Sequence, residues 1–174
     1  MPRKIILYIA CSLDGYIATQ NDDISFLQCV EKEGEDYGYT KFTETIDTLI
    51  VGRKTYEKVI HIGYSYHPDK EVYVISQTKN EAPYYGGDLL ELIQKLKNKE
   101  GKNIYCDGGS QLIRTLLGFR QIDEIIVSII PVMLGSGIRL FAEREEELNN
   151  LELLACTHFD TDLVQLHYAF KNKQ

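Results

Sequence analysis

The stretch IYCDGGSQLIRTLL, residues 104–117, indicates the class of fold. An apolar, β-leaning run, residues 104–106, meets two adjacent glycines and then an amphipathic run. Glycine is unfavourable inside strands and helices, because ordering it costs more backbone entropy and it has no side chain to pack. Gly108 and Gly109 therefore mark a junction between a strand and a helix.

The same alternation of strand and helix patterns recurs along the chain. Apolar, β-leaning segments cover residues 4–11, 48–52, 71–76, 103–107 and 124–134. Helical patterns cover residues 35–46, 53–60, 88–99 and 110–118, with Asp88 and Ser110 as the expected N-caps of the last two. The first, third and fifth strand segments are apolar on both faces, which is typical of parallel strands covered by helices. The sequence predicts an α/β fold with a mainly parallel central sheet flanked by helices.

The end of the chain has a different pattern. Residues 151–159 and 163–170 are two alternating segments around a short DTD turn. This pattern predicts an antiparallel hairpin that closes one edge of the sheet. No repeat, low-complexity segment or linker divides the chain, so we expect a single domain over residues 1–174.

Composition and charge exclude several classes of function. The chain has 174 residues and a net charge of -7, which argues against nucleic acid as the main partner. No run approaches the ~20 apolar residues that span a bilayer, and the apolar run at the N-terminus is too short for a secretory signal. The cysteines show no paired spacing, and three of them, Cys11, Cys106 and Cys156, lie in apolar runs where we expect them buried. The sequence predicts a cytoplasmic protein.

The double glycine has two interpretations. A helix N-terminus offers free N–H groups and partial positive charge, and Gly108 and Gly109 let a phosphate approach that backbone closely. The alternative is a tight turn that requires positive φ and binds nothing.

A second junction favours a bound anion. Gly52 ends a strand, and Arg53, Lys54 and Thr55 begin the next helix. Two cations at a helix N-terminus oppose the helix dipole unless an anion lies among them, although they can also be solvated surface charges. A third strand end carries Ser76 and Gln77 within the segment SQTK, which suits a ribose phosphate. Two glycine junctions in one sheet together favour an anionic ligand.

These segments resemble a known family. ACSLDGYIA, TLIVGRKTYE, VISQT and YCDGGSQL occur in the order and spacing of the dihydrofolate reductase superfamily. IDEIIVSIIPVMLGSGIRLF resembles more specifically the reductase domain of the bifunctional deaminase-reductase of riboflavin biosynthesis and its small stand-alone relatives. The resemblance covers nearly the whole chain and implies a dihydrofolate reductase-like fold with NADPH as hydride donor.

The resemblance also implies roles for individual residues. Ala10 and Ile17 would hold the nicotinamide carboxamide through their backbones, and Asp14 and Gly15 would shape the loop over that ring. Arg53 would read the 2′-phosphate, together with Gln77, and Ser76 would lie along the adenosine. The other residues implied at the cofactor phosphates are Gly52, Lys54, Thr55, Gly108, Gly109, Ser110 and Gln111.

The reacting centre needs a proton source as well as a hydride. The resemblance implies a carboxylate early in the helix before the second strand, and ungapped counting from Gly52 reaches Asp36, with Ser128 as the hydroxyl near it. Asp36 is then either a buried acid of raised pKa or a simple helix charge within the acidic segment EKEGEDYG. Tyr37, Tyr39 and Phe42 form either a stacking wall for a flat heterocycle or ordinary core.

Three functions remain open from the sequence. The first is an NADPH-dependent reductase of a flat nitrogen heterocycle, with the ribosylaminopyrimidine phosphate of riboflavin biosynthesis ahead of dihydrofolate. The chain lacks the Pro-Trp of the folate enzymes, and only Lys32, Lys41 and Arg139 are candidates to bind a substrate phosphate. The others are an NADPH-binding module without turnover and a dimeric interaction protein. No His, Cys or carboxylate spacing suggests a metal, and a homodimer is one possible assembly.

Overall fold

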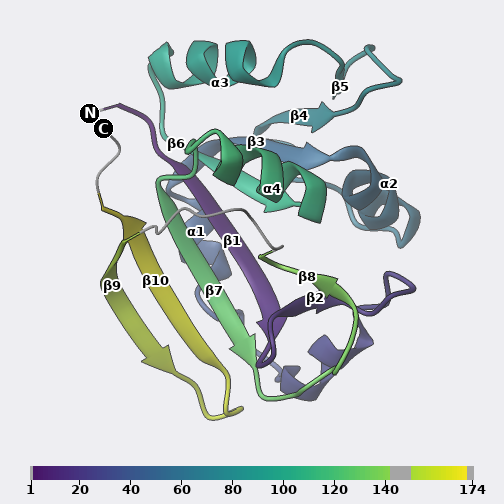
Figure 1. Ribbon diagram of the computed structural model, residues 1–174, viewed down its shortest axis with the longest axis vertical. Coiled ribbons are helices and arrows are strands. Elements are labelled where there is room, and N and C mark those ends of the chain that lie inside the picture. The colour runs from purple at the N-terminus through teal and green to yellow at the C-terminus, as the bar shows by residue number, and fades with distance from the viewer. Residues whose placement is uncertain (1, 142–149, 172–174) are drawn as a thin grey trace.

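An eight-stranded sheet forms the centre of the computed structural model, which describes residues 2–141 and 150–171 (Figure 1). The strand order is β5-β4-β3-β6-β1-β7-β10-β9, and β2 and β8 form a separate small sheet. The strands are β1 (Ile5–Ser12), β2 (Tyr16–Ala18), β3 (Ile46–Gly52), β4 (Glu71–Ile75), β5 (Tyr84–Tyr85), β6 (Asn103–Gly108), β7 (Glu124–Ile130), β8 (Ile138–Arg139), β9 (Leu151–His158) and β10 (Val164–Phe170).

The pairing of these strands confirms the predicted architecture. β1 pairs in parallel with both β6 and β7, and β3 pairs in parallel with both β4 and β6. β10 runs antiparallel to β7 and to β9, so the C-terminal hairpin closes one edge of the sheet.

Helices cover both faces of the sheet. They are α1 (Tyr39–Thr43), α2 (Arg53–His61), α3 (Leu89–Asn98) and α4 (Ser110–Gly118), with one 3-10 helix, η1 (Ser25–Val30). Apolar residues of α3 and α4 pack into one core cluster, and Phe42 of α1 and Tyr56 of α2 contribute to a cluster that lies across the sheet from it. In Figure 1, α4 lies in front of the sheet and α1 behind it.

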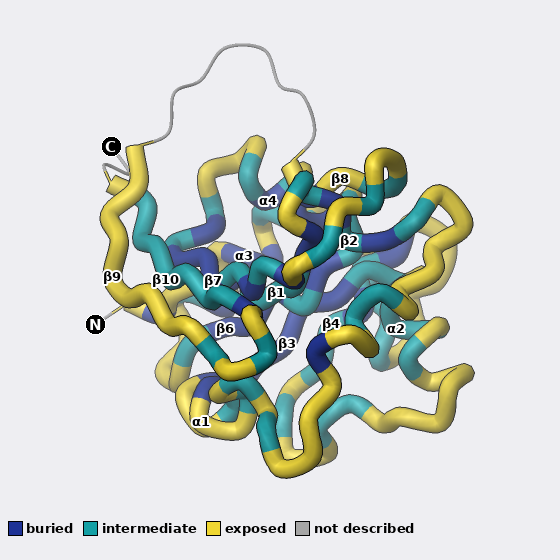
Figure 2. The backbone as a smooth tube through the Cα atoms, turned by 90° about the horizontal axis from the view of Figure 1, so that it is seen from below, coloured by how far each residue is buried: buried dark blue, intermediate teal, exposed yellow. Residues whose placement is uncertain are grey.

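The period of two along each central strand builds these two cores. In β1, Ile5 and Leu7 belong to the cluster of α3 and α4, whereas Ile6 and Tyr8 belong to the cluster of α1. The same alternation places Cys106 and Tyr105 of β6 on opposite faces. Figure 2 shows the buried central strands and, at the edge, an exposed β9.

Some sequence expectations were wrong at the ends of elements. The helix expected over residues 35–46 spans only Tyr39–Thr43, because Tyr37 and Gly38 adopt left-handed backbone conformations that a helix does not allow. Ser110 is the first residue of α4 rather than its N-cap, which is Gly109. Asp88 is the N-cap of α3 as expected, and its carboxylate accepts the N–H of Glu91 at 2.8 Å.

Burial also differs from the expectation in two places. β4 is only partly buried, because its outer neighbour β5 has just two residues and leaves much of it uncovered. Cys156 is exposed on the edge strand β9, whereas Cys11 and Cys106 are buried as expected. All four cysteines are free thiols. Of the helices within residues 2–141 and 150–171, none combines the length and the apolar character that a bilayer crossing requires.

Candidate functional site

The two glycine junctions lie side by side at the carboxyl edge of the sheet. β3 and β6 are neighbours, and Val51 pairs with Gly108 in register. A Cβ built on Gly52, the N-cap of α2, would lie 3.4 Å from the carbonyl oxygen of Gly108. A Cβ on Gly109, the N-cap of α4, would lie 3.1 Å from Thr55 Oγ1. Because both caps are glycine, no cap side chain covers the first N–H groups of either helix, and the two helix ends form one cradle.

The two cations at the start of α2, Arg53 and Lys54, differ in exposure and in pairing. Arg53 is half-buried and its Nη1 donates to Glu57 Oε2 at 2.9 Å. The second carboxylate oxygen of Glu57 accepts Lys79 Nζ at 2.7 Å. Lys54 is exposed. Glu57 therefore holds Arg53 and Lys79 together beside the cradle, and its pKa is lowered by the hydrogen bond from Lys79 and by the charges of both cations.

The loop after β4 brings Lys79 to that position. Ser76 is buried, and its Oγ accepts the N–H groups of Thr78 at 3.2 Å and Lys79 at 3.0 Å. The hydroxyl oxygen of Ser76 thus closes a turn, while Gln77 stays exposed. On the other side of the cradle, Ser110 is half-buried and Gln111 is exposed in the first turn of α4.

Asp14 fixes the loop between β1 and β2. Its Oδ1 accepts Ser12 Oγ at 2.6 Å and the N–H of Leu134 at 3.1 Å, and its Oδ2 accepts the N–H of Gly135 at 2.7 Å. The hydrogen bond from Ser12 is the largest cause of the lowered pKa of Asp14. Gly15 follows with φ of +86°, a left-handed conformation that favours glycine. Ile17, in β2, packs against the core of α3 and α4.

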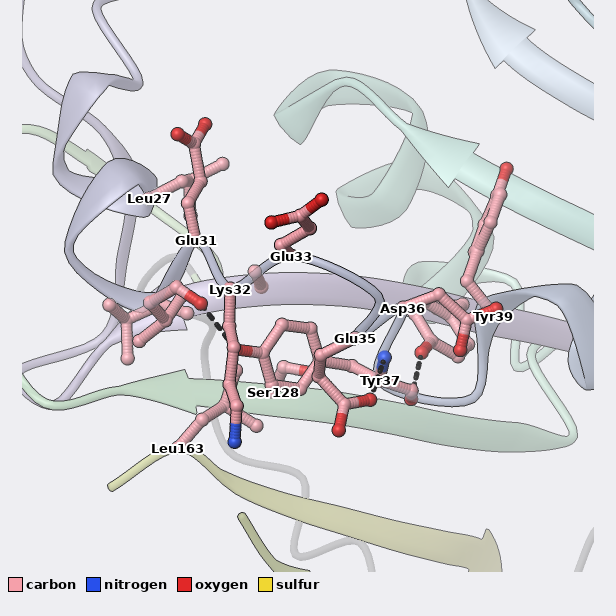
Figure 3. A pocket seen from close by; sticks show the side chains of 14 residues that line it. Leu27, Glu31, Lys32, Glu33, Glu35, Asp36, Tyr37, Tyr39, Ser128 and Leu163 are labelled. Atoms are coloured by element: carbon pink, nitrogen blue, oxygen red, sulfur yellow. Dashed lines mark hydrogen bonds between the residues drawn. The ribbon is translucent and has the colours of Figure 1, made fainter. Parts of the chain in front are cut away.

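A cavity of about 560 Å³ opens at the carboxyl ends of β1 and β7. η1, the loop after it and β7 supply most of its wall (Figure 3). Ala10 and Ser128, a register pair of β1 and β7, both line it. The remaining lining residues are Tyr8, Leu27, Val30, Glu31, Lys32, Glu33, Glu35, Asp36, Tyr37, Tyr39, Ile130 and Leu163.

Asp36 lines this cavity but is not a buried acid. The residue is exposed, and its carboxylate accepts the N–H groups of Gly38 and Thr40, each at 2.9 Å. Hydrogen bonds from Thr40 are the largest cause of its lowered pKa, so the carboxylate is ionised at neutral pH. Of the two alternatives, the structure therefore contradicts the buried acid of raised pKa and agrees with the charge at the start of the helix, because the Asp36 carboxylate accepts N–H groups at the start of α1.

Ser128 is buried within a small polar cluster. Its Oγ accepts Gln165 Nε2 at 3.1 Å, and the same amide nitrogen lies 3.0 Å from the hydroxyl of Tyr8. The Tyr8 hydroxyl donates to the carbonyl of Tyr37 at 2.9 Å, and burial raises the pKa of Tyr8. Gln165 and Ser128 are register partners of β10 and β7, so only the fold brings them together.

The predicted stacking wall is divided between cavity and core. Tyr37 and Tyr39 line the cavity, and the ring of Tyr37 meets Phe159 edge-on at 4.9 Å between centroids. Phe42 is buried and packs against the rings of Tyr8 and Tyr105 at 4.7 and 5.1 Å between centroids. Phe42 is thus a core residue.

Sequence reasoning missed several polar groups at this edge. Asp107, just before Gly108, accepts the hydroxyls of Tyr105 and Tyr66, and burial raises its pKa despite these bonds. Glu57 had a detectable signal, because it lies four residues after Arg53 on one helix. Gln165 had none. Within the described residues, no three His, Cys, Asp or Glu side chains are grouped to hold a metal.

Comparison with known proteins agrees with this architecture. The family model of the RibD C-terminal domain matches residues 3–165. The uncharacterized Bacillus subtilis (strain 168) protein YwjB is 41% identical over 97% of this chain and 99% of its own. The crystal structure of a Shewanella sp. PV-4 protein assigned to riboflavin biosynthesis is 30% identical and covers 99% of this chain and 100% of its own, with a TM-score of 0.88.

A more distant structure shares the fold. Dihydrofolate reductase from Enterococcus faecalis, solved in complex with NADP(H) and RAB-propyl, has a TM-score of 0.66 at 17% identity over 97% of each chain. At this identity the comparison shows a shared dihydrofolate reductase-like fold. With residues 3–165 matched and the strand order in place, the chain belongs to the RibD C-terminal domain family.

Proposed function

We propose that this chain is an NADPH-dependent reductase of a flat nitrogen heterocycle, of the riboflavin-pathway reductase type. The observation that carries the proposal is the adjacency of the two glycine junctions, which form one cradle next to β1 and its cavity. A Cβ at Gly52 or Gly109 would narrow that cradle, so the residues present fit a diphosphate. When bound, NADPH would supply the hydride.

Under the proposal, the cofactor-binding residues of this chain divide into three groups. Arg53 and Lys79, which Glu57 holds together, would face the 2′-phosphate, with Ser76 and Gln77 near the adenosine ribose. Gly52, Lys54, Thr55, Gly108, Gly109, Ser110 and Gln111 would hold the diphosphate, and Ala10, Asp14, Gly15 and Ile17 would form the nicotinamide end. Ala10 would contact both the nicotinamide and the substrate, because it also lines the cavity.

The substrate would lie in the cavity against Ser128 and Asp36. The buried cluster of Ser128, Gln165 and Tyr8 offers fixed hydrogen-bonding groups to a polar ring edge. Ionised Asp36 would orient a donor group or a water rather than hold the transferred proton itself. The proton would then come from water at the open rim.

The exposure of Asp36 also favours a second candidate, an NADPH-binding module without turnover. Fluorescence titration with NADPH and NADH, followed by a turnover screen with dihydrofolate and the ribosylaminopyrimidine phosphate, separates the two. Reduction of any such heterocycle supports the reductase, and tight NADPH binding without turnover supports the module. Absence of NADPH binding would overturn both.

We also propose a homodimer that forms at β9. This strand lies at the end of the sheet order, and Leu151, Leu153 and Leu154 are 40, 52 and 47% exposed. A free edge with apolar side chains invites a second strand. Analytical ultracentrifugation should show a dimer that Leu153→Lys dissociates, whereas Phe119→Lys, at an exposed site after α4, leaves it intact. A monomeric unmodified chain would contradict this assembly.

The remaining expectations stay proposals. A cytoplasmic location fits the four free thiols, because the cytosol keeps cysteines reduced. A single functional domain fits the pairing of β1 and β10 to the same strand, β7.

A further inference from the structure

The rim of the cavity has an excess of negative charge. Four carboxylates line it, those of Glu31, Glu33, Glu35 and Asp36, against one ammonium group, that of Lys32. All five belong to the loop between η1 and α1. In Figure 3, Glu31 and Glu33 project to one side of this loop, and Lys32 projects to the other.

These carboxylates act as anions at neutral pH. Hydrogen bonds from Thr40 and Gly38 hold the pKa of Asp36 below its usual value. Glu31 and Glu33 are exposed, and both count toward the formal net charge of -7 at pH 7. Glu35 Oε1 accepts the N–H of Tyr37 at 2.8 Å, which fixes this carboxylate against the loop.

The one cation is already paired. Lys32 Nζ lies 3.1 Å from Asp160 Oδ2, in the turn between β9 and β10. Of the other cations that a substrate phosphate was expected to need, Lys41 is exposed on α1 and Arg139 lies over the ring of Tyr16, 4.9 Å from its centroid. Among the described residues that line the cavity, none offers a cation free of a carboxylate partner.

This charge distribution decides which substrates the cavity can admit. A phosphate monoester carries about -1.5 to -2 charges at neutral pH and would meet four carboxylates at the entrance. An amino-substituted ring without phosphate meets the same groups as hydrogen-bond acceptors. Tyr37 and Tyr39 add flat apolar surface, and Ser128 adds a hydroxyl at the floor.

We propose, on the basis of the proposed function, that this cavity accepts a neutral or cationic amino-substituted nitrogen heterocycle and discriminates against the phosphorylated form of the same compound. The charges are exposed, so the discrimination depends on ionic strength.

The test uses two probes that differ only by a phosphate. 5-Amino-6-ribosylaminouracil and its 5′-phosphate are titrated by calorimetry into the full chain saturated with NADP⁺, which cannot reduce them, at about 0.05 and about 0.5 M salt. We expect the unphosphorylated probe to bind about tenfold more tightly at low salt, with a ratio that falls at high salt. Equal or tighter binding of the phosphate overturns the proposal, and so does failure of both probes to bind.

Neutral variants locate the effect. Glu31→Gln with Glu33→Gln should tighten binding of the phosphorylated probe about threefold or more and change that of the unphosphorylated probe less than about twofold. The control, Glu91→Gln with Glu100→Gln, removes the same charge from exposed positions outside the cavity lining and should change neither. An equal gain in the control would assign the effect to net charge and overturn the proposal.

NADPH titration on the same samples distinguishes failure of the proposed substrate class from failure of the proposed function. NADPH binding without discrimination between the probes rejects the substrate class alone. Absence of NADPH binding rejects the proposed function.

Discussion

At the scale of single residues, the sequence identified charged and polar side chains but not the partners that they contact. Arg53 was predicted to meet an anion, and the structure pairs it with Glu57, which also pairs with Lys79. Asp36 lies in the cavity lining as expected, yet hydrogen bonds from Thr40 and Gly38 lower its pKa rather than raise it. A pKa depends on the hydrogen bonds and burial of the group, and the spacing of residues in the sequence does not reveal these.

Arg53 supplies the residue-scale prediction. Arg53→Ala removes a charge-assisted contact to the 2′-phosphate and should weaken NADPH binding about ten- to a hundredfold. NADH lacks this phosphate, so its affinity should stay within about threefold. Fluorescence titration measures both cofactors. Lys54→Ala is the control: Lys54 is an exposed neighbour, and its replacement should weaken NADPH binding less. Equal weakening of NADPH and NADH binding by Arg53→Ala would show that Arg53 does not bind the 2′-phosphate.

At the scale of elements, the sequence predicted the centres of helices and strands better than their ends. The strand and helix cores were located correctly, and both glycine junctions lie at the ends of strands. The helix expected over residues 35–46 was too long, because the left-handed backbone at Tyr37 and Gly38 interrupts it. An acidic, aromatic segment has no strong local signal for such a conformation.

Gly109 supplies the element-scale prediction. Its φ of +58° is left-handed, and a Cβ there would meet Thr55 Oγ1 at 3.1 Å. Gly109→Ala should therefore lower the free energy of unfolding by about 1–2 kcal/mol and also weaken NADPH binding. Urea denaturation and fluorescence titration measure the two effects.

Gly63→Ala is the matched control for this backbone effect. Gly63 has φ of +86° and no atom within 4 Å of an added Cβ. This variant should lose similar stability yet keep its NADPH affinity. Unchanged NADPH binding in Gly109→Ala would contradict the cradle.

At the scale of the whole molecule, one buried cation connects three parts of the fold. Arg3 is 5% exposed, and its guanidinium donates to Asp47, to Thr48 Oγ1 at 2.7 Å and to the carbonyl of Leu96 at 3.2 Å. These groups belong to β3 and α3, next to the start of β1. Burial opposes ionisation of Asp47, but hydrogen bonds from Lys102 and Thr48 and the charge of Arg3 outweigh it, so its pKa is lowered.

Asp47 supplies the whole-molecule prediction. A lowered pKa in the fold gives stability that is present above the unfolded pKa, about 3.9, and is lost as the pH falls through the folded value. Asp47→Asn leaves a buried donor of Arg3 poorly paired and should cost about 1–3 kcal/mol at pH 7. Urea denaturation should show this difference shrinking below about pH 4. A difference that is independent of pH would exclude the ion pair as its cause.

The sequence by itself determined the α/β class, the C-terminal hairpin and the positions of both glycine junctions. The spacing of apolar residues and the positions of glycines favour strands, helices and turns through neighbouring residues alone, without any long-range contact. The tertiary structure alone decided that the two junctions meet, that Gln165 reaches Ser128, and that the loop with four carboxylates lines the cavity. These depend on strand order and register, which bring together residues far apart in the chain, and on loop conformations that chain-wide packing selects.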